Sequence, residues 1–190
     1  MKNPNPFEWL SIKAQKQGFV ILLVVTLVVT GGLRFFDGKL KTEAAPNGIV
    51  SFEFAGNLEA AENILASWGP KGAVYAGLSL GLDFLFLFSY AGAIGLGCVL
   101  AARGLFQRMI MFSLLGVPLA WGQLCAALLD AAENISLIQV LLGSESVLWP
   151  ALAFWCAIPK FLIVAAGLIY IVVSVVLLMI GKDRTQVSCL

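Results

Sequence analysis

Four apolar segments, each long enough to cross a lipid bilayer, constrain this chain more than any other feature. They run over about 18–36, 73–102, 109–142 and 147–180, and a transmembrane helix needs roughly 20 mostly apolar residues. A helix satisfies its own backbone hydrogen bonds, which a span in hydrocarbon requires. The sequence therefore predicts an all-α integral membrane protein, a four-helix transmembrane bundle that forms a single domain over 1–190.

Composition agrees with a membrane protein and excludes several kinds of site. The chain is 60% hydrophobic and 12% charged, whereas soluble domains carry about a quarter charged residues. A net charge of +1 lacks the basic excess of a nucleic-acid-binding protein, so we expect no nucleic-acid partner. Histidine, the commonest metal ligand and general base, does not occur, and the four cysteines match no zinc or redox spacing. We therefore expect no catalytic residue, metal site or cofactor.

The basic residues predict one orientation in the membrane. Arg103 and Arg108 lie between the second and third segments, Lys182 and Arg184 follow the fourth, and the connection after the third carries only Glu145. Lysine and arginine are enriched in cytoplasmic loops. We therefore expect a multi-pass protein of the cell (inner) membrane whose N- and C-termini are cytoplasmic.

The long connection at 37–72 is then on the outer side, and it contains a predicted helix. Residues 49–54 suggest a short extended or interfacial piece. Asn57 is a plausible N-cap, and Gly69 and Pro70 are expected to end the helix that follows. Apolar residues between them recur at helical spacing: Leu58, Ala61, Ile64, Leu65 and Trp68. We expect an outer amphipathic helix between spans one and two, on the membrane surface or as a lid over the bundle.

The third and fourth segments are longer than a single span needs. They must therefore tilt, kink or protrude from the bilayer. Pro118 and Pro159 are the expected kink points, because proline removes a helical hydrogen bond and its ring crowds the preceding turn.

Charged residues interrupt three of the four segments. Asp83 lies in the second, Asp130 and Glu133 in the third, and Lys160 in the fourth. A charge at the bilayer centre costs at least about 2.5–3.5 kcal/mol on insertion scales. At 1.5 Å per residue, all four lie roughly 12–18 Å below the outer helix ends. We therefore expect them to meet inside the bundle, with Lys160 within salt-bridge or one-water reach of an acid.

Helical spacing adds polar neighbours to this cluster. Asn134 shares a face with Asp130, Gln123 precedes Asp130 by one heptad, and Tyr90 shares a face with Asp83. The candidates for ligand or ion binding are Asp83, Asp130, Glu133, Asn134, Lys160, Gln123 and Tyr90.

Three interpretations of the cluster remain open on sequence grounds. It is a structural lock that fixes helix register, a binding site for a ligand or ion, or a catalytic site in which paired carboxyl groups do acid–base work. Replacing the lysine alone, and then together with its partner acid, distinguishes a lock from a binding site.

Several short pieces of the chain, taken in order, resemble a loose pattern in uncharacterised bacterial four-span integral membrane proteins. The resemblance covers most of the chain. The resemblance implies a four-span topology and marks these positions as important, and it implies no known activity. The pieces are Phe52-Glu53, Trp68-Gly69, Leu82-Asp83-Phe84, Asp130-x-x-Glu133-Asn134 and Lys160.

The leading functional expectation is a non-enzymatic polytopic membrane protein. It binds a lipophilic ligand, or assembles with a membrane partner, around the Asp/Glu/Lys cluster. A small proton- or cation-coupled transporter is the first alternative, and a lipid-modifying membrane enzyme is the second. The expected partners are membrane lipid, a lipophilic ligand, and either a second copy of the chain or another membrane protein.

Overall fold

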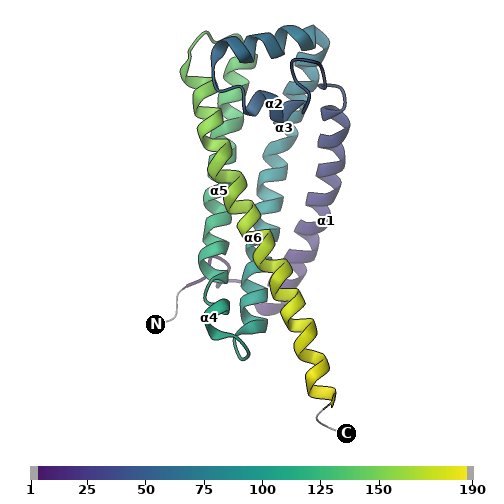
Figure 1. Cartoon of the computed structure of the whole chain (residues 1–190), viewed down its shortest axis with the longest axis vertical. Coiled ribbons are helices and arrows are strands. Elements are labelled where there is room, and N and C mark those ends of the chain that lie inside the picture. Colours follow the sequence, from purple (N-terminus) through teal and green to yellow (C-terminus); the bar gives the residue numbers. More distant parts are fainter. Residues whose placement is uncertain (1–3, 188–190) are drawn as a thin grey trace.

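The computed structural model describes residues 4–187, with side chains described as far as residue 180. The side chains of Lys182 and Arg184 therefore lie outside the described residues. Within the described chain all regular structure is helical, and four stretches are long and apolar enough to cross a membrane. The all-α bundle is thereby confirmed. In chain order (Figure 1) the helices are α1 Ile12–Asp37, α2 Ile49–Glu53, α3 Leu58–Leu105, α4 Ile110–Ser113, α5 Gly116–Leu141 and α6 Leu148–Val187.

The long helices alternate in direction, so the bundle has two distinct ends. α3 packs against α1, α5 and α6, and α5 packs against α6. The first and last described residues lie at the end of the bundle that holds α4, while α2 and the first part of α3 cover the other end (Figure 1). Arg103 lies in the last turn of α3, and Glu59 lies in its first turn, so these two residues are at opposite ends as expected.

The outer helix begins and ends where the sequence predicts. The Asn57 side chain caps it by accepting a hydrogen bond from the Ala60 backbone N–H at 2.9 Å. Gly69 has φ 62° and ψ −173°, which interrupts the helix, and Pro70 opens the membrane-crossing part of α3. Glycine suits this conformation because it has no Cβ to clash. The run 58–68 is therefore a separate helix joined to the span by a sharp bend.

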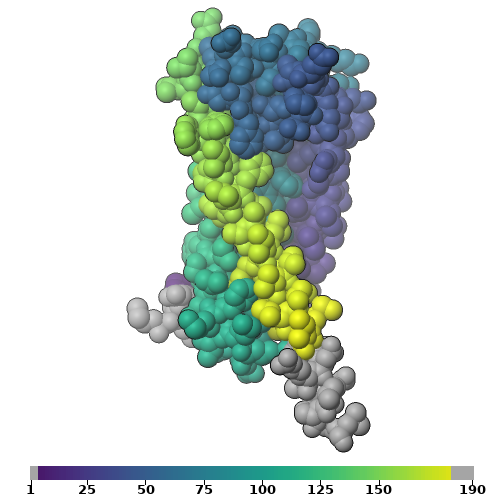
Figure 2. Space-filling model, in the orientation of Figure 1, coloured from purple at the N-terminus to yellow at the C-terminus, as the bar shows by residue number. Residues whose placement is uncertain are grey.

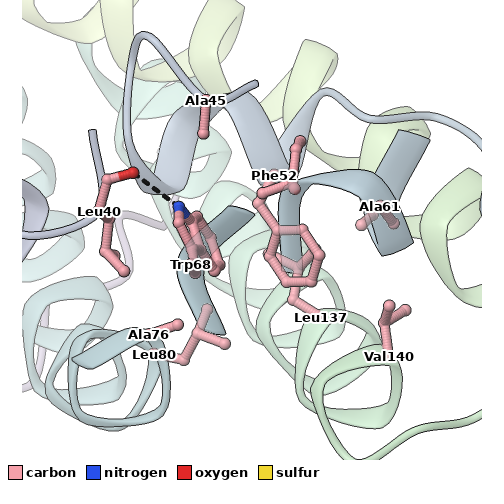
Figure 3. Close-up of a cluster of buried hydrophobic side chains, with 11 residues drawn as sticks. Leu40, Ala45, Phe52, Ala61, Trp68, Ala76, Leu80, Leu137 and Val140 are labelled. Carbon is pink, nitrogen blue, oxygen red and sulfur yellow. Dashed lines mark hydrogen bonds between the residues drawn. The ribbon is translucent and has the colours of Figure 1, made fainter. Parts of the chain in front are cut away.

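This outer helix is a lid packed onto the bundle. Ala61, Ile64 and Trp68 are buried in an apolar cluster that also includes Leu137 and Val140 from α5 (Figure 3). The Trp68 Nε1–H donates a hydrogen bond to the Leu40 carbonyl oxygen at 2.6 Å. We call residues 38–68 the outer cap, because side chains from its loop, from α2 and from the outer helix pack in one core.

Three local expectations differ from the structure. Residues 49–53 form helix α2, so an extended piece is wrong there. The apolar run 109–142 is divided into α4 and α5. Pro118 lies in the first turn of α5, where its missing N–H has no helical partner to lose, so it is not a mid-helix kink. Pro159 does lie inside α6.

Candidate functional site

Lys160 is the centre of the buried polar cluster. Its Nζ lies 2.9 Å from Asp130 Oδ1 and 2.7 Å from Glu133 Oε2. Lys160 is 6% exposed, Asp130 3% and Glu133 0%. The expected ion pair between α6 and α5 is therefore confirmed. Removing one partner of such a buried pair leaves an uncompensated charge.

Small residues on α6 bring the lysine close to α5. Ala153, Cys156 and Ala157 are buried on the same helix, and small side chains let neighbouring helices approach. The face of α5 that meets them presents Asp130 and Glu133 three residues apart, hence on one side of the helix. The close packing of α5 and α6 thus accompanies the contact between Lys160 and the two acids.

A second polar contact joins α3 to α5. The Asn134 Nδ2 group donates a hydrogen bond to Asp83 Oδ2 at 2.6 Å. Asn134 is buried and Asp83 is half-buried. Four of the sequence-predicted residues thus come together with Lys160 across α3, α5 and α6.

Glu53 joins this cluster from outside the spans; the resemblance marks its position as important, but it is not among the candidates for ligand or ion binding. Its Oε2 lies 3.9 Å from Lys160 Nζ. Burial raises the pKa of the Glu53 carboxyl above its ordinary range; the attraction of Lys160 opposes that rise, and the charge of Asp130 adds to it. A signal did exist: Glu53 stands between Phe52 and Phe54, and an acid flanked by aromatic residues is unusual in a solvated loop.

The outer cap fixes the position of Glu53. The preceding residue, Phe52, is 1% exposed and packs edge-on against the Trp68 ring at a centroid distance of 5.3 Å (Figure 3). At the other end of α2, the Ile49 backbone N–H donates to Asp37 Oδ1 at 3.0 Å. Gly48, with φ 58°, makes the turn into α2. Both ends of this short helix are therefore anchored, and its last residue reaches the cluster.

A cavity of about 710 Å³ lies beside the cluster and is only partly enclosed. The wall of the cavity is mostly apolar, and ionisable side chains also line it. Figure 2 shows α3 at the back of a recess between α6 and α1. The lining includes Thr26, Leu27 and Thr30 of α1, Asp83, Phe86, Tyr90 and Ile94 of α3, Asp130 and Asn134 of α5, Lys160, Val164 and Leu168 of α6, and Glu53.

The remaining candidates separate into two groups. Tyr90 lines the cavity and is 5% exposed, and its hydroxyl has no hydrogen-bond partner among the described residues. Gln123 is buried but does not line the cavity; its Nε2 donates to the Ile163 carbonyl oxygen at 3.0 Å. Tyr90 therefore belongs with the cavity, and the amide of Gln123 joins α5 to α6.

The arrangement suits binding of cations and hydrogen-bond donors. Four acids, Asp37, Glu53, Asp83 and Asp130, line the cavity beside three basic side chains, Arg34, Lys41 and Lys160, and ionised carboxylates only accept hydrogen bonds. Within the part of the chain that the structure describes, no group of three His, Cys, Asp or Glu side chains is arranged to hold a metal ion. Comparisons of the chain with protein-family models, curated proteins and solved structures find no match.

Proposed function

We propose that this polytopic protein binds a lipophilic ligand in the cavity beside Lys160. The observation that carries the proposal is the cavity itself, about 710 Å³ and only partly enclosed, together with the recess between α1 and α6 in Figure 2. Sites for small molecules typically measure about 300–1,000 Å³, with apolar walls and a few polar groups that fix orientation. The apolar wall accommodates a hydrocarbon body, and the ionisable end orients a polar head.

Unsatisfied polar atoms favour a ligand site over a structural lock alone. A lock needs only the pairs that Lys160 makes with Asp130 and Glu133. The Tyr90 hydroxyl and Glu53 Oε2 are buried without a hydrogen-bond partner among the described residues. Tyr90 and Glu53 both line the cavity, and buried polar groups in proteins are nearly always hydrogen-bonded, so a molecule bound there would provide the partners that these two atoms lack.

The proposal includes a location and an orientation. We place the chain in the cell (inner) membrane with both termini in the cytoplasm, because Arg103 and Arg108 flank the turn at the end of the bundle that also holds the termini. The outer cap, with Glu59 and Glu62, then faces away from the cytoplasm. The open side of the cavity faces lipid, from which a lipophilic molecule enters.

A matched pair of substitutions on α6 tests ligand binding. Val164 lines the cavity, whereas Val176 is exposed on the outer surface of the same helix. Wild type, Val164→Trp and Val176→Trp are purified from membranes in mild detergent, and native mass spectrometry identifies retained small molecules. We expect wild type and Val176→Trp to retain the same molecule and Val164→Trp to lose it. An identical set of bound molecules in all three proteins would refute the proposal.

A small proton- or cation-coupled transporter is the second candidate. The specific observation that favours it is the number of carboxyl groups around one lysine: Glu53, Asp130 and Glu133 all lie within 4.0 Å of Lys160 Nζ. Asp83 lines the same cavity and accepts a hydrogen bond from Asn134 of α5. Proton or cation flux in proteoliposomes, lost in Asp83→Asn, would support transport. Turnover of a lipid extract would instead indicate a lipid-modifying enzyme.

A further inference from the structure

The polar end of the cavity presents acids from three separate elements. Glu53 comes from α2, Asp83 from α3 and Asp130 from α5, and all three line the cavity together with Lys160. An anionic head group placed here would meet carboxyl groups on several sides. A head group whose only charge is a carboxylate or phosphate is therefore disfavoured next to Glu53, Asp83 and Asp130.

Three basic side chains line the cavity, Arg34, Lys41 and Lys160, and Lys160 is already engaged by α5. Its Nζ is within hydrogen-bonding distance of Asp130 and Glu133, at 2.9 and 2.7 Å, but lies 3.9 Å from Glu53 Oε2. That longer separation is beyond a hydrogen bond, and Glu53 Oε2 has no such partner among the described residues. Glu53 is thus a cavity carboxyl that Lys160 satisfies less well than it satisfies Asp130.

Asp83 also lacks a close positive charge. Its one hydrogen bond among the described residues comes from the neutral amide of Asn134, and its side chain lines the cavity. The Tyr90 hydroxyl, buried and without a partner, lies along the same face of α3 two turns further from the cap. Tyr90 is an independent indication that a polar contact belongs in this cavity.

Resting on the proposed function, we propose that the ligand is a lipophilic amine whose protonated nitrogen lies between Glu53 and Asp83. An ammonium group donates up to three hydrogen bonds, and its positive charge favours a charge-assisted contact with both carboxyl groups. Its hydrocarbon part lies along Phe86, Ile94 and Leu168. The Tyr90 hydroxyl contacts a polar atom near the head of the ligand.

Three probes with the same chain and different heads test the proposal. Dodecylamine, dodecanol and dodecanoate are titrated at pH 7 against the full chain in phosphatidylcholine nanodiscs, and binding is followed by competition with the ligand retained from membranes, or by thermal shift. We expect dodecylamine to bind at least about tenfold more tightly than dodecanol, as charge-assisted hydrogen bonds exceed neutral ones. Dodecanoate should bind most weakly.

The variants are chosen to isolate the head-group contact. Glu53→Gln and Asp83→Asn should each reduce the preference for dodecylamine over dodecanol by about tenfold. Glu59→Gln removes an exposed acid from the outer helix and should leave the preference unchanged. An unchanged preference in both Glu53→Gln and Asp83→Asn would overturn the proposal, as would equal binding of the three probes in wild type.

The outcomes also separate this proposal from the proposed function. Equal binding of all three probes, abolished by Val164→Trp, would retain the lipophilic site and reject the amine. Absence of binding by any probe, with no effect of Val164→Trp on retained molecules, would reject both. A lipid head group and a free lipophilic amine present the same nitrogen. Competition by phosphatidylethanolamine in the nanodisc would identify the lipid as the source, and lack of competition would identify a free amine.

Discussion

At the scale of single residues, Lys160 neutralises acids that would otherwise be buried without a counter-charge. Lys160→Met leaves Asp130 and Glu133, 3% and 0% exposed, facing each other without a base. We expect a loss of about 3–5 kcal/mol in the free energy of unfolding, measured by denaturant or thermal unfolding in detergent. Lys160→Met combined with Glu133→Gln should recover much of that loss.

The same pair of variants distinguishes a lock from a binding site. If the cluster only fixes helix register, the double variant should regain both stability and the molecule retained from membranes. If the cluster contributes to ligand binding, the double variant should fold well and still bind less. A Lys160→Met protein as stable as wild type would contradict the structural role of the ion pairs.

Glu53 gives the molecule a pH-dependent residue in the outer cap. Because burial raises its pKa, the folded chain keeps a proton that the unfolded chain has lost, over the pH range from about 4.5 up to the raised value. The contribution of Glu53 to stability therefore falls as pH rises through that range. The groups that face it are Lys160, Asp130, Glu133 and Asp37.

The side chain in Glu53→Gln does not titrate, so this variant does not share the loss of stability that wild type shows as pH rises. The melting temperature of Glu53→Gln relative to wild type should rise as pH is raised from about 4.5. Thermal unfolding of both proteins in detergent across pH 4–9 measures the difference, with Glu59→Gln as the exposed control. Parallel melting curves for wild type and Glu53→Gln would show that Glu53 is not buried as described.

At the scale of elements, the bend at Gly69 determines how the outer helix meets the bundle. Its φ of 62° with ψ −173° belongs to a region that is nearly restricted to glycine, and other residues there cost about 1–3 kcal/mol. A Cβ at Gly69 would meet nothing within 4 Å, so any loss comes from the backbone. We expect Gly69→Ala to destabilise the protein by that amount in detergent unfolding.

A second glycine on α3 provides the control. Gly81 also has nothing within 4 Å of an added Cβ and lies in regular helix. Gly81→Ala should be neutral or stabilising by about 0.5–1 kcal/mol, because alanine loses less conformational entropy in a helix. Equal effects of the two substitutions would mean that the bend does not require glycine.

At the scale of the whole molecule, the two ends of the bundle should face opposite sides of the membrane. Glu62 and Gln107 are both exposed, one on the outer helix and the other just after α3. In a cysteine-free background, a membrane-impermeant thiol reagent added outside intact cells should label Glu62→Cys and not Gln107→Cys. After permeabilisation both should react. Labelling of both positions in intact cells would contradict the proposed orientation.

The sequence predicts the spans and much of the cluster because the same physical rule governs both. Hydrocarbon excludes unpaired charge, so counting residues from the helix ends was enough to bring Lys160 to Asp130 and Glu133. Counting residues from the helix ends cannot place Glu53, since Glu53 lies in a connection that folds back toward the bundle. Gln123 shows the converse: it shares a helical face with Asp130, yet its amide bonds to a backbone carbonyl of α6.

The order of the charges along the chain has a consequence for synthesis. Glu53, Asp83, Asp130 and Glu133 all precede Lys160, and chains emerge from the ribosome N-terminus first. Until α6 has been made, the nascent protein holds acids in its interior with no lysine to pair them. We therefore expect a chain that is released or truncated before α6 to be less stable, and more readily degraded, than the full chain.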